Sequence, residues 1–114
     1  MIHSAIRIPL APEKMAEVVG ILRAVVERTR ADPGCLACHL YQDLQDSRVL
    51  MFEELWKSEC DLTRHLRTES YRKVLLVIEM AASTPEVRFH TVSHATGVET
   101  IEQARLGRPE TRPP

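Results

Sequence analysis

Aromatic residues are scarce in this chain of 114 residues, which contains five of them. They are Tyr41, Phe52, Trp56, Tyr71 and Phe89. Small-molecule pockets are lined mainly by apolar and aromatic side chains, so a chain this short and this poor in aromatic residues cannot enclose a large pocket alone. The length fits one domain, because two independent cores would each be too small to be stable.

The sequence also has no excess of basic charge and no long apolar run. Its 15 Lys and Arg residues are matched by 16 Asp and Glu residues, with a pI of about 6.5, which argues against a nucleic-acid partner. The apolar run 2–10 is interrupted by His3 and Arg7 and is far too short to span a bilayer, so we expect no membrane association.

Cysteines are few and odd in number, unlike the even framework of a small secreted domain, so we expect a cytoplasmic location. Cys35 and Cys38 have C-x-x-C spacing, but they open a predicted strand, where positions three apart point to opposite faces. A redox pair needs its first cysteine at a helix N-terminus, and a zinc site needs further ligands. We therefore expect a structural role and no metal site.

Apolar spacing predicts the elements of the chain. Alternation predicts strands over 2–8, 36–43, 49–56 and 86–93, and helical spacing predicts a long helix that starts near Pro12 and ends before 32–34. Further helices are expected after Ser58, from about Glu69 to Pro85, and over 99–105. We expect a domain over 1–95, a C-terminal extension over 96–106 that contacts a dimer interface, and a disordered tail over 107–114.

The predicted order is β-α-β-β-α-β, the ferredoxin-like α+β arrangement, in which helices cover one face of a four-stranded antiparallel sheet. The other face needs a second layer that this chain does not provide. A homodimer that pairs two such faces would supply it.

Four short motifs in this order carry a family resemblance. The segment 30–35 (R-A-D-P-G-C) resembles an R-x-x-P-G-C loop, 41–43 is Y-Q-D, 54–56 (E-L-W) resembles an E-x-W strand motif, and 65–67 begins with H-L. Over residues 2–91 the chain thereby resembles the antibiotic biosynthesis monooxygenase (ABM) domain family, whose members are dimeric α+β barrels.

The resemblance implies an oxygenation without a cofactor, in which a deprotonated phenol, quinol or anthrone passes an electron directly to O2. Such a reaction requires a dry pocket, a base and donors that stabilise the developing oxyanion, and no flavin, haem or metal. Haem-degrading members of the family use an asparagine on the first strand, where this chain has Ile6, and the chain contains no asparagine.

Strand alternation predicts that polar and aromatic side chains gather on the sheet face away from the helices. These are His3, Arg7, His39, Tyr41, Phe52, Glu54, Trp56, Arg88 and His90. We expect Trp56 and Tyr41 to hold a substrate, with Phe52, His39, His90 and Arg7 also binding it. We expect His65, which helical spacing turns inward, or Glu54 to transfer protons.

Structural readings of the same residues remain open. Trp56 and Glu54 fit equally well at a dimer interface, with Glu54 paired to an arginine, and His65 fits as a packed core histidine. His39, Tyr41 and His90 fit as polar interface contacts. For function, a cofactor-free monooxygenase comes first, and the alternatives are an isomerase or lyase of a small oxygenated metabolite and a non-enzymatic dimeric ligand-binding module.

Overall fold

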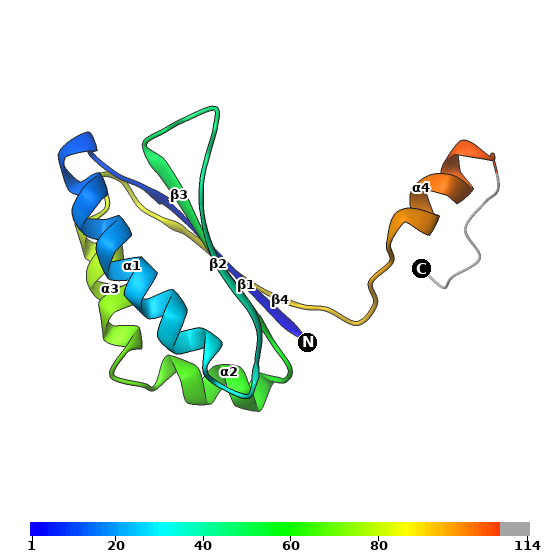
Figure 1. The fold of residues 1–114 in the computed structure, drawn as a ribbon, viewed down its shortest axis with the longest axis horizontal. Helices are drawn as coiled ribbons and strands as arrows, with labels where there is room; N and C mark the ends of the chain where they lie inside the picture. The colour runs from blue at the N-terminus through cyan, green and yellow to red at the C-terminus, as the bar shows by residue number, and fades with distance from the viewer. Residues whose placement is uncertain (108–114) are drawn as a thin grey trace.

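The chain folds as a ferredoxin-like α+β domain with a four-stranded antiparallel sheet in the order β2-β3-β1-β4 (Figure 1). This is a computed structural model, and it describes residues 1–107. Its elements are β1 (Ile2–Pro9), a short 3₁₀ helix (Pro12–Lys14), α1 (Met15–Arg30), β2 (Cys35–Gln42), β3 (Val49–Trp56), α2 (Glu59–Leu66), α3 (Tyr71–Met80), β4 (Glu86–Thr91) and α4 (Val98–Arg105). The tail expected over 107–114 lies, apart from Gly107, outside the described residues.

The helices begin where the local chemistry favours a start. Pro12 occupies the first position of the 3₁₀ turn that leads into α1, a place where the missing amide hydrogen costs nothing. At α2 the Ser58 hydroxyl accepts a hydrogen bond of 3.1 Å from the Asp61 amide, as the predicted cap requires. In α1 the buried positions recur at helical spacing and pack on the sheet.

The register of the sheet decides which strand residues lie under the helices. Directly opposed residues in antiparallel strands share a face, and β1 pairs with β3 so that Ile6 opposes Phe52, Ser4 opposes Glu54 and Ile2 opposes Trp56. All six side chains are buried, on the side covered by α1, α2 and α3.

This register corrects the predicted faces. Phe52, Glu54 and Trp56 lie beneath the helices and not on the open face, whereas Arg7, His39 and the other predicted polar residues of β1, β2 and β4 do lie on the open face. Alternation defines two faces of β3, but both carry apolar and acidic side chains, so the pattern alone favoured the wrong one. The buried face is the one that carries Glu54.

A β-bulge corrects a second expectation. The register shifts between Cys35 and Ala37, so that Cys35 opposes Trp56 and Cys38 opposes Glu54. Leu36 is the extra residue, and its side chain is exposed. The bulge thus places both cysteines on the helix-facing side instead of on opposite faces, and both are free thiols.

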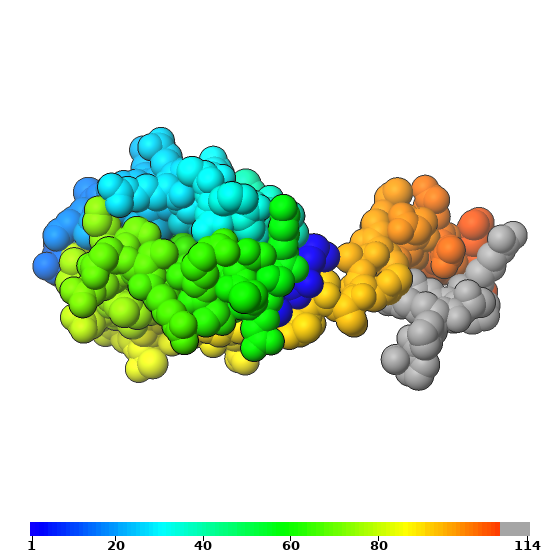
Figure 2. All heavy atoms as spheres, turned by 90° about the horizontal axis from the view of Figure 1, so that it is seen from below, coloured from blue at the N-terminus to red at the C-terminus, as the bar shows by residue number. Residues whose placement is uncertain are grey.

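The C-terminal arm, defined here as residues 92–107, extends away from the domain and carries α4. Figure 2 shows α4 as a separate lobe beside the body of the molecule. The arm leaves β4 next to the N-terminus, where the Val92 amide donates a 2.8 Å hydrogen bond to the Met1 carbonyl. No helix within residues 1–107 has the length and apolar character needed to cross a membrane.

Candidate functional site

A buried pair of ionisable side chains lies between the sheet and α2. Glu54 comes from the helix-facing side of β3 and is fully buried, and His65 comes from the inner face of α2 and is 3% exposed. His65 Nε2 lies 2.7 Å from Glu54 Oε2, although the angle falls outside hydrogen-bond geometry. A carboxylate in a dry core is costly unless a positive or hydrogen-bonding group accompanies it, and His65 is that group.

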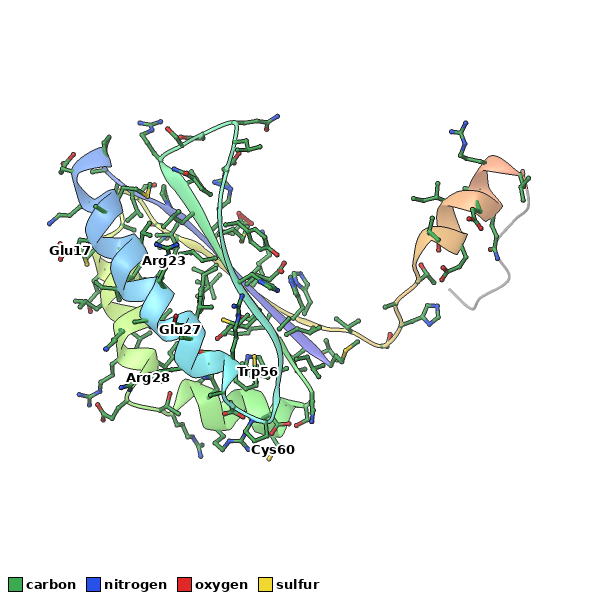
Figure 3. The ribbon with its side chains drawn as sticks, viewed as in Figure 1. Glu17, Arg23, Glu27, Arg28, Trp56 and Cys60 are labelled. Carbon is green, nitrogen blue, oxygen red and sulfur yellow. The ribbon has the colours of Figure 1, made fainter. Side chains whose placement is uncertain are left out.

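Two aromatic rings enclose His65. The Trp56 ring lies against it with centroids 4.4 Å apart and an interplanar angle of 31°, and the Tyr71 ring meets it edge-on at 5.2 Å and 81°. Trp56 lies at the end of the sheet nearest to α2 (Figure 3). Because Trp56 is two residues beyond Glu54 on the same strand face, the strand presents the carboxylate and the indole side by side. The imidazole is therefore held by an anion and two aromatic walls.

Several buried polar atoms around this pair form no hydrogen bond within the described part of the chain. They include Ser4 Oγ, Glu54 Oε1 and Trp56 Nε1. An unsatisfied buried polar atom lowers the free energy of unfolding by about 1–3 kcal/mol. Three such atoms in or beside one buried pair therefore destabilise a small domain substantially. Polar atoms left open in this way are suited to bind a polar group of a ligand.

The Glu54 carboxylate contributes to the raised pKa values of two buried neighbours. Burial, reinforced by the Glu54 carboxylate, raises the pKa of the Tyr71 phenol to about 12. The same two causes, in the same order, raise the pKa of the Cys38 thiol to about 12. Both groups stay protonated at neutral pH and do not compete with His65 as bases.

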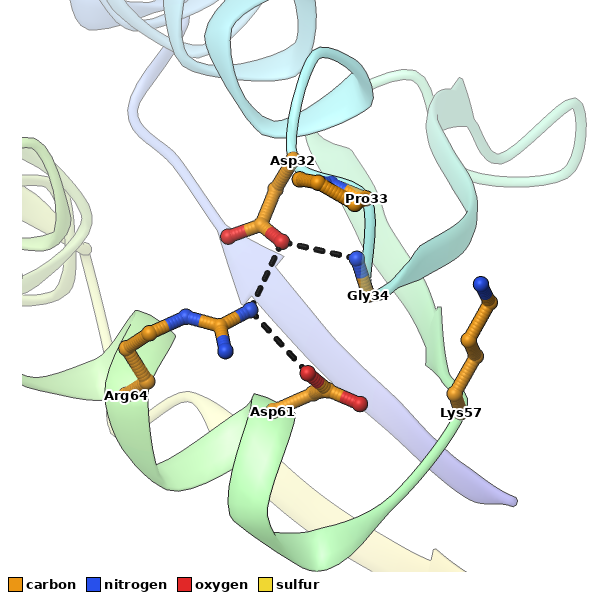
Figure 4. A pocket seen from close by; sticks show the side chains of 6 residues that line it. All are labelled: Asp32, Pro33, Gly34, Lys57, Asp61 and Arg64. Atoms are coloured by element: carbon orange, nitrogen blue, oxygen red, sulfur yellow. Dashed lines mark hydrogen bonds and ion pairs between the residues drawn. The ribbon is translucent and has the colours of Figure 1, made fainter.

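An ion-pair cluster holds α2 against the loop between α1 and β2. Arg64 Nη2 lies 2.8 Å from Asp32 Oδ1 and 3.0 Å from Asp61 Oδ1, and the Asp32 carboxylate also accepts a 2.8 Å hydrogen bond from the Gly34 amide (Figure 4). The Ser58 hydroxyl and Arg64 keep the pKa of Asp61 below its ordinary value. Arg64 directly precedes His65, so this cluster fixes the helix turn that carries the imidazole.

The open face carries a separate polar cluster. His3 Nε2 lies 3.0 Å from Glu53 Oε2, Glu53 also accepts a long hydrogen bond of 3.5 Å from Tyr41, and the His3 and His90 rings stack at 6.0 Å. Arg7 pairs with Asp43 at 3.2 Å, and Arg30 reaches His39 Nδ1 at 3.0 Å. These groups are partly solvated and, apart from Arg30 at the end of α1, lie across the sheet from His65.

The structure therefore divides the predicted site residues into two groups. Glu54, Trp56 and His65 meet in one buried cluster, and Phe52 lies beside them in the apolar core. The expected substrate-binding residues Tyr41, His39, His90 and Arg7 lie across the sheet. Within one chain they cannot line the same pocket as His65, because the sheet itself lies between them.

Two members of the cluster were not predicted. Ser4 had a signal in the sequence, since it is a lone polar residue among Ile2, Ile6 and Ile8 on the core face of β1. Tyr71 had none, because its helical spacing is that of an ordinary core residue.

Among residues 1–107, no group of three or more His, Cys, Asp or Glu side chains is arranged to hold a metal ion.

Comparisons with known proteins agree on the family. Residues 1–75 match the family model described as antibiotic biosynthesis monooxygenase. A crystal structure described as antibiotic biosynthesis monooxygenase is 28% identical with a TM-score of 0.74, and the alignment covers 82% of this chain and all of the other. A conserved protein from Methanosarcina mazei Go1 is 26% identical with a TM-score of 0.73, over 78% of this chain and 89% of the other.

A longer relative is also similar in sequence. An uncharacterized protein from Synechocystis is 23% identical over 87 residues, which is 75% of this chain. The matched region spans 59% of that relative's length.

Proposed function

Because the chain belongs to the antibiotic biosynthesis monooxygenase family, we propose that it is a cofactor-independent monooxygenase that oxidises a quinol-like or polycyclic aromatic small molecule with O2. The observation that supports this activity is the buried Glu54–His65 pair enclosed by Trp56 and Tyr71. A base held in a dry, aromatic-walled site is what the reaction needs from the protein, since the substrate anion itself reduces O2.

We assign His65 as the base and Glu54 as its positioning residue. Because Nε2 faces the Glu54 carboxylate, Nδ1 is the nitrogen that accepts the substrate proton. The imidazolium that forms is stabilised by the carboxylate at 2.7 Å. Trp56 provides a flat surface against a planar substrate, and its indole N–H, which has no partner within the described residues, is available to an oxyanion.

The overall reaction balances without a cofactor. For an anthrone, the CH₂ group loses two hydrogens and gains one oxygen atom from O2, and the second oxygen atom leaves as water. The four electrons taken from the carbon reduce O2 completely, so no external reductant is consumed.

Substrate reaches His65 only if part of the cover moves, because the imidazole and its carboxylate are almost fully buried. In our proposal the moving part is α2, which is short and opens when the partly exposed Arg64–Asp32 ion pair to the α1–β2 loop breaks. Such opening of a short helix is a common gating motion in enzymes.

Oxygen uptake in the presence of hydroquinones and anthrones tests the activity. We expect the wild-type chain to consume O2 with at least one substrate and the variants His65→Ala and Glu54→Gln to lose about 10²-fold or more of the rate. His3→Gln is the matched control, since it removes a histidine–carboxylate pair on the opposite sheet face. Absence of uptake across the panel, or equal loss in His3→Gln, would contradict the assignment.

The same assay separates the alternatives. Turnover that continues under strict anaerobiosis would identify an isomerase or lyase that uses the same base. A thermal shift with aromatic ligands, without any chemistry, would identify a binding module.

We also propose that two copies pair through their open sheet faces, which makes the chain a homodimer. The support is that a four-stranded sheet carries Met51, Leu55 and Ala5 half-buried on a face that no element within residues 1–107 covers. Pairing two such faces removes these apolar side chains from water and surrounds them with the polar cluster of the open face.

A further inference from the structure

The C-terminal arm carries a helix that has no packing partner among residues 1–107. No residue of α4 is buried, and the apolar side chains of Val98 and Ile101 on α4 and of Leu106 just after it are 65%, 60% and 69% exposed. Within the described residues, no hydrogen bond or ion pair joins 93–107 to the rest of the chain. An isolated helix of eight residues is unstable in water, so α4 requires a surface to pack against.

The start of α4 is nevertheless well defined by local bonds. Glu99 Oε1 accepts a 2.7 Å hydrogen bond from the Gly97 amide, and the Thr100 hydroxyl donates to Thr96 Oγ1 at 2.6 Å. These bonds set the direction of the helix as it leaves β4, which is away from the body (Figures 1 and 2). The chain is thus arranged to present the helix to something beyond itself.

The body of the molecule has a matching uncovered strip. On the helix-facing side of β4, Val87 opposes Ile6 and Phe89 opposes Ser4. Ile6 and Ser4 are fully buried, but Val87 and Phe89 are 44% and 45% exposed, because the helical layer ends before this edge strand. The helix-facing side of β4 therefore carries two large apolar side chains that the helices leave exposed.

We propose that α4 of one chain packs on the Val87–Phe89 strip of a second copy. Each copy supplies one helix and one strip, so the exchange is reciprocal and closes as a two-fold dimer. Val98 and Ile101, three residues apart on one face of α4, lie against the apolar strip of the partner. The partner's arm in turn covers the first copy, which leaves no apolar helix or strip exposed to further copies.

This proposal is independent of the pairing through open sheet faces, and a cross-linking experiment tests it directly. In a Cys60→Ser background, a chain with Ile101→Cys is mixed with a differently sized, tagged chain with Phe89→Cys, and the mixture is oxidised. We expect a disulfide-linked heterodimer at least about tenfold more abundant than with Gln103→Cys, which lies on the opposite face of α4. A yield no higher than this control would overturn the proposal.

A second measurement excludes packing of α4 on its own chain. When both cysteines are placed in one chain, we expect the disulfide to link two chains at micromolar concentration, and a monomer with an internal disulfide would overturn the proposal. Val98→Asp with Ile101→Asp should raise the dimer dissociation constant at least about tenfold, since two apolar side chains lose their cover. An unchanged dissociation constant would also contradict it, and folding of the body is checked by circular dichroism.

Discussion

At the scale of single residues, the buried Glu54–His65 pair is the polar feature of the core that costs the most stability. A buried carboxylate beside unsatisfied polar atoms destabilises the core. Two apolar side chains of similar volume would give a more stable fold. Burial distinguishes the Glu54–His65 pair from the partly solvated His3–Glu53 pair on the other side of the sheet. Two neighbouring glutamates on one strand thus have opposite environments.

Glu54→Gln should lower the free energy of unfolding by about 1–3 kcal/mol, because it replaces the carboxylate that faces the buried His65 ring with a neutral amide. Glu53→Gln, one position along β3, should cost less than about 1 kcal/mol, since its pair is partly solvated. Urea denaturation of both variants at pH 7 measures the difference. Equal losses would show that the buried pair is no more tightly coupled to folding than the exposed one.

The raised pKa of Tyr71 predicts that the fold loses stability at alkaline pH. Its pKa is raised from 10.0 to about 12 in the folded chain, so folding favours the neutral phenol. This contribution is fully present below pH 10 and is lost as the pH rises towards 12. Tyr71→Phe should therefore flatten the decline of stability between pH 10 and 12 in urea titrations. Tyr41→Phe, at an exposed phenol, is the control, and a similar flattening there would contradict the prediction.

The residue types of the site were visible in the sequence, but their environments were not. The E-L-W and H-L motifs predicted Glu54, Trp56 and His65 as a group, and helical spacing correctly turned His65 inward. Which face of β3 is buried depends on its register with β1, a contact between distant parts of the chain that alternation does not encode. Ser4 and Tyr71 became part of the site only through this packing.

At the scale of secondary-structure elements, the contact between the α1–β2 loop and α2 is too close to admit a larger side chain at Gly34. A Cβ atom at Gly34 would lie 2.5 Å from Asp61 Cγ and Oδ1. Asp61 is held by the Ser58 hydroxyl and by Arg64, so it cannot move without loosening the start of α2.

Gly34→Ala should therefore destabilise the chain by about 1–3 kcal/mol, because the added methyl group displaces the Asp61 side chain. Gly20→Ala is the matched substitution within α1, where nothing lies within 4 Å of the new Cβ, and it should stabilise by about 0.5–1 kcal/mol. Thermal unfolding of both variants gives opposite shifts if the contact is as described. A neutral Gly34→Ala would mean that α2 adjusts freely.

Elements were easier to predict than their irregularities. The strands and helices follow from alternation, helical spacing and the Ser58 cap, all of which are local. The bulge at Leu36 was not predicted, because an extra residue in one strand is defined only by its partner strand. Its effect was to turn Cys35 to the same side as Cys38.

At the scale of the whole molecule, the open sheet face sets the expected assembly. Met51 lies on β3, near the middle of this face, opposite Arg7 on one side and Tyr41 on the other. In the proposed face-to-face dimer this position is buried by the second copy.

Met51→Lys should weaken self-association and shift the chain towards smaller species, because a charge would be buried between the paired open faces. Sedimentation at several protein concentrations measures the shift. Ala24→Lys, at an exposed position of α1, adds the same charge away from the open sheet face and is the control. Dimerisation that is unaffected by Met51→Lys would contradict the pairing of open faces without bearing on the exchange of α4.

The residues of the buried pair lie close together in the sequence, and this has a consequence for folding and for evolution. Glu54, Trp56 and His65 lie on one strand–turn–helix segment, residues 54–65, so only a short loop has to close to bring them together. The reactive groups are encoded by one contiguous stretch of the gene, while Ser4 and Tyr71 come from outside it. A single recombination event between related genes would therefore transfer Glu54, Trp56 and His65 together into another ferredoxin-like protein. The residues of that protein that correspond to Ser4 on β1 and Tyr71 on α3 would then determine the surroundings of the Glu54–His65 pair.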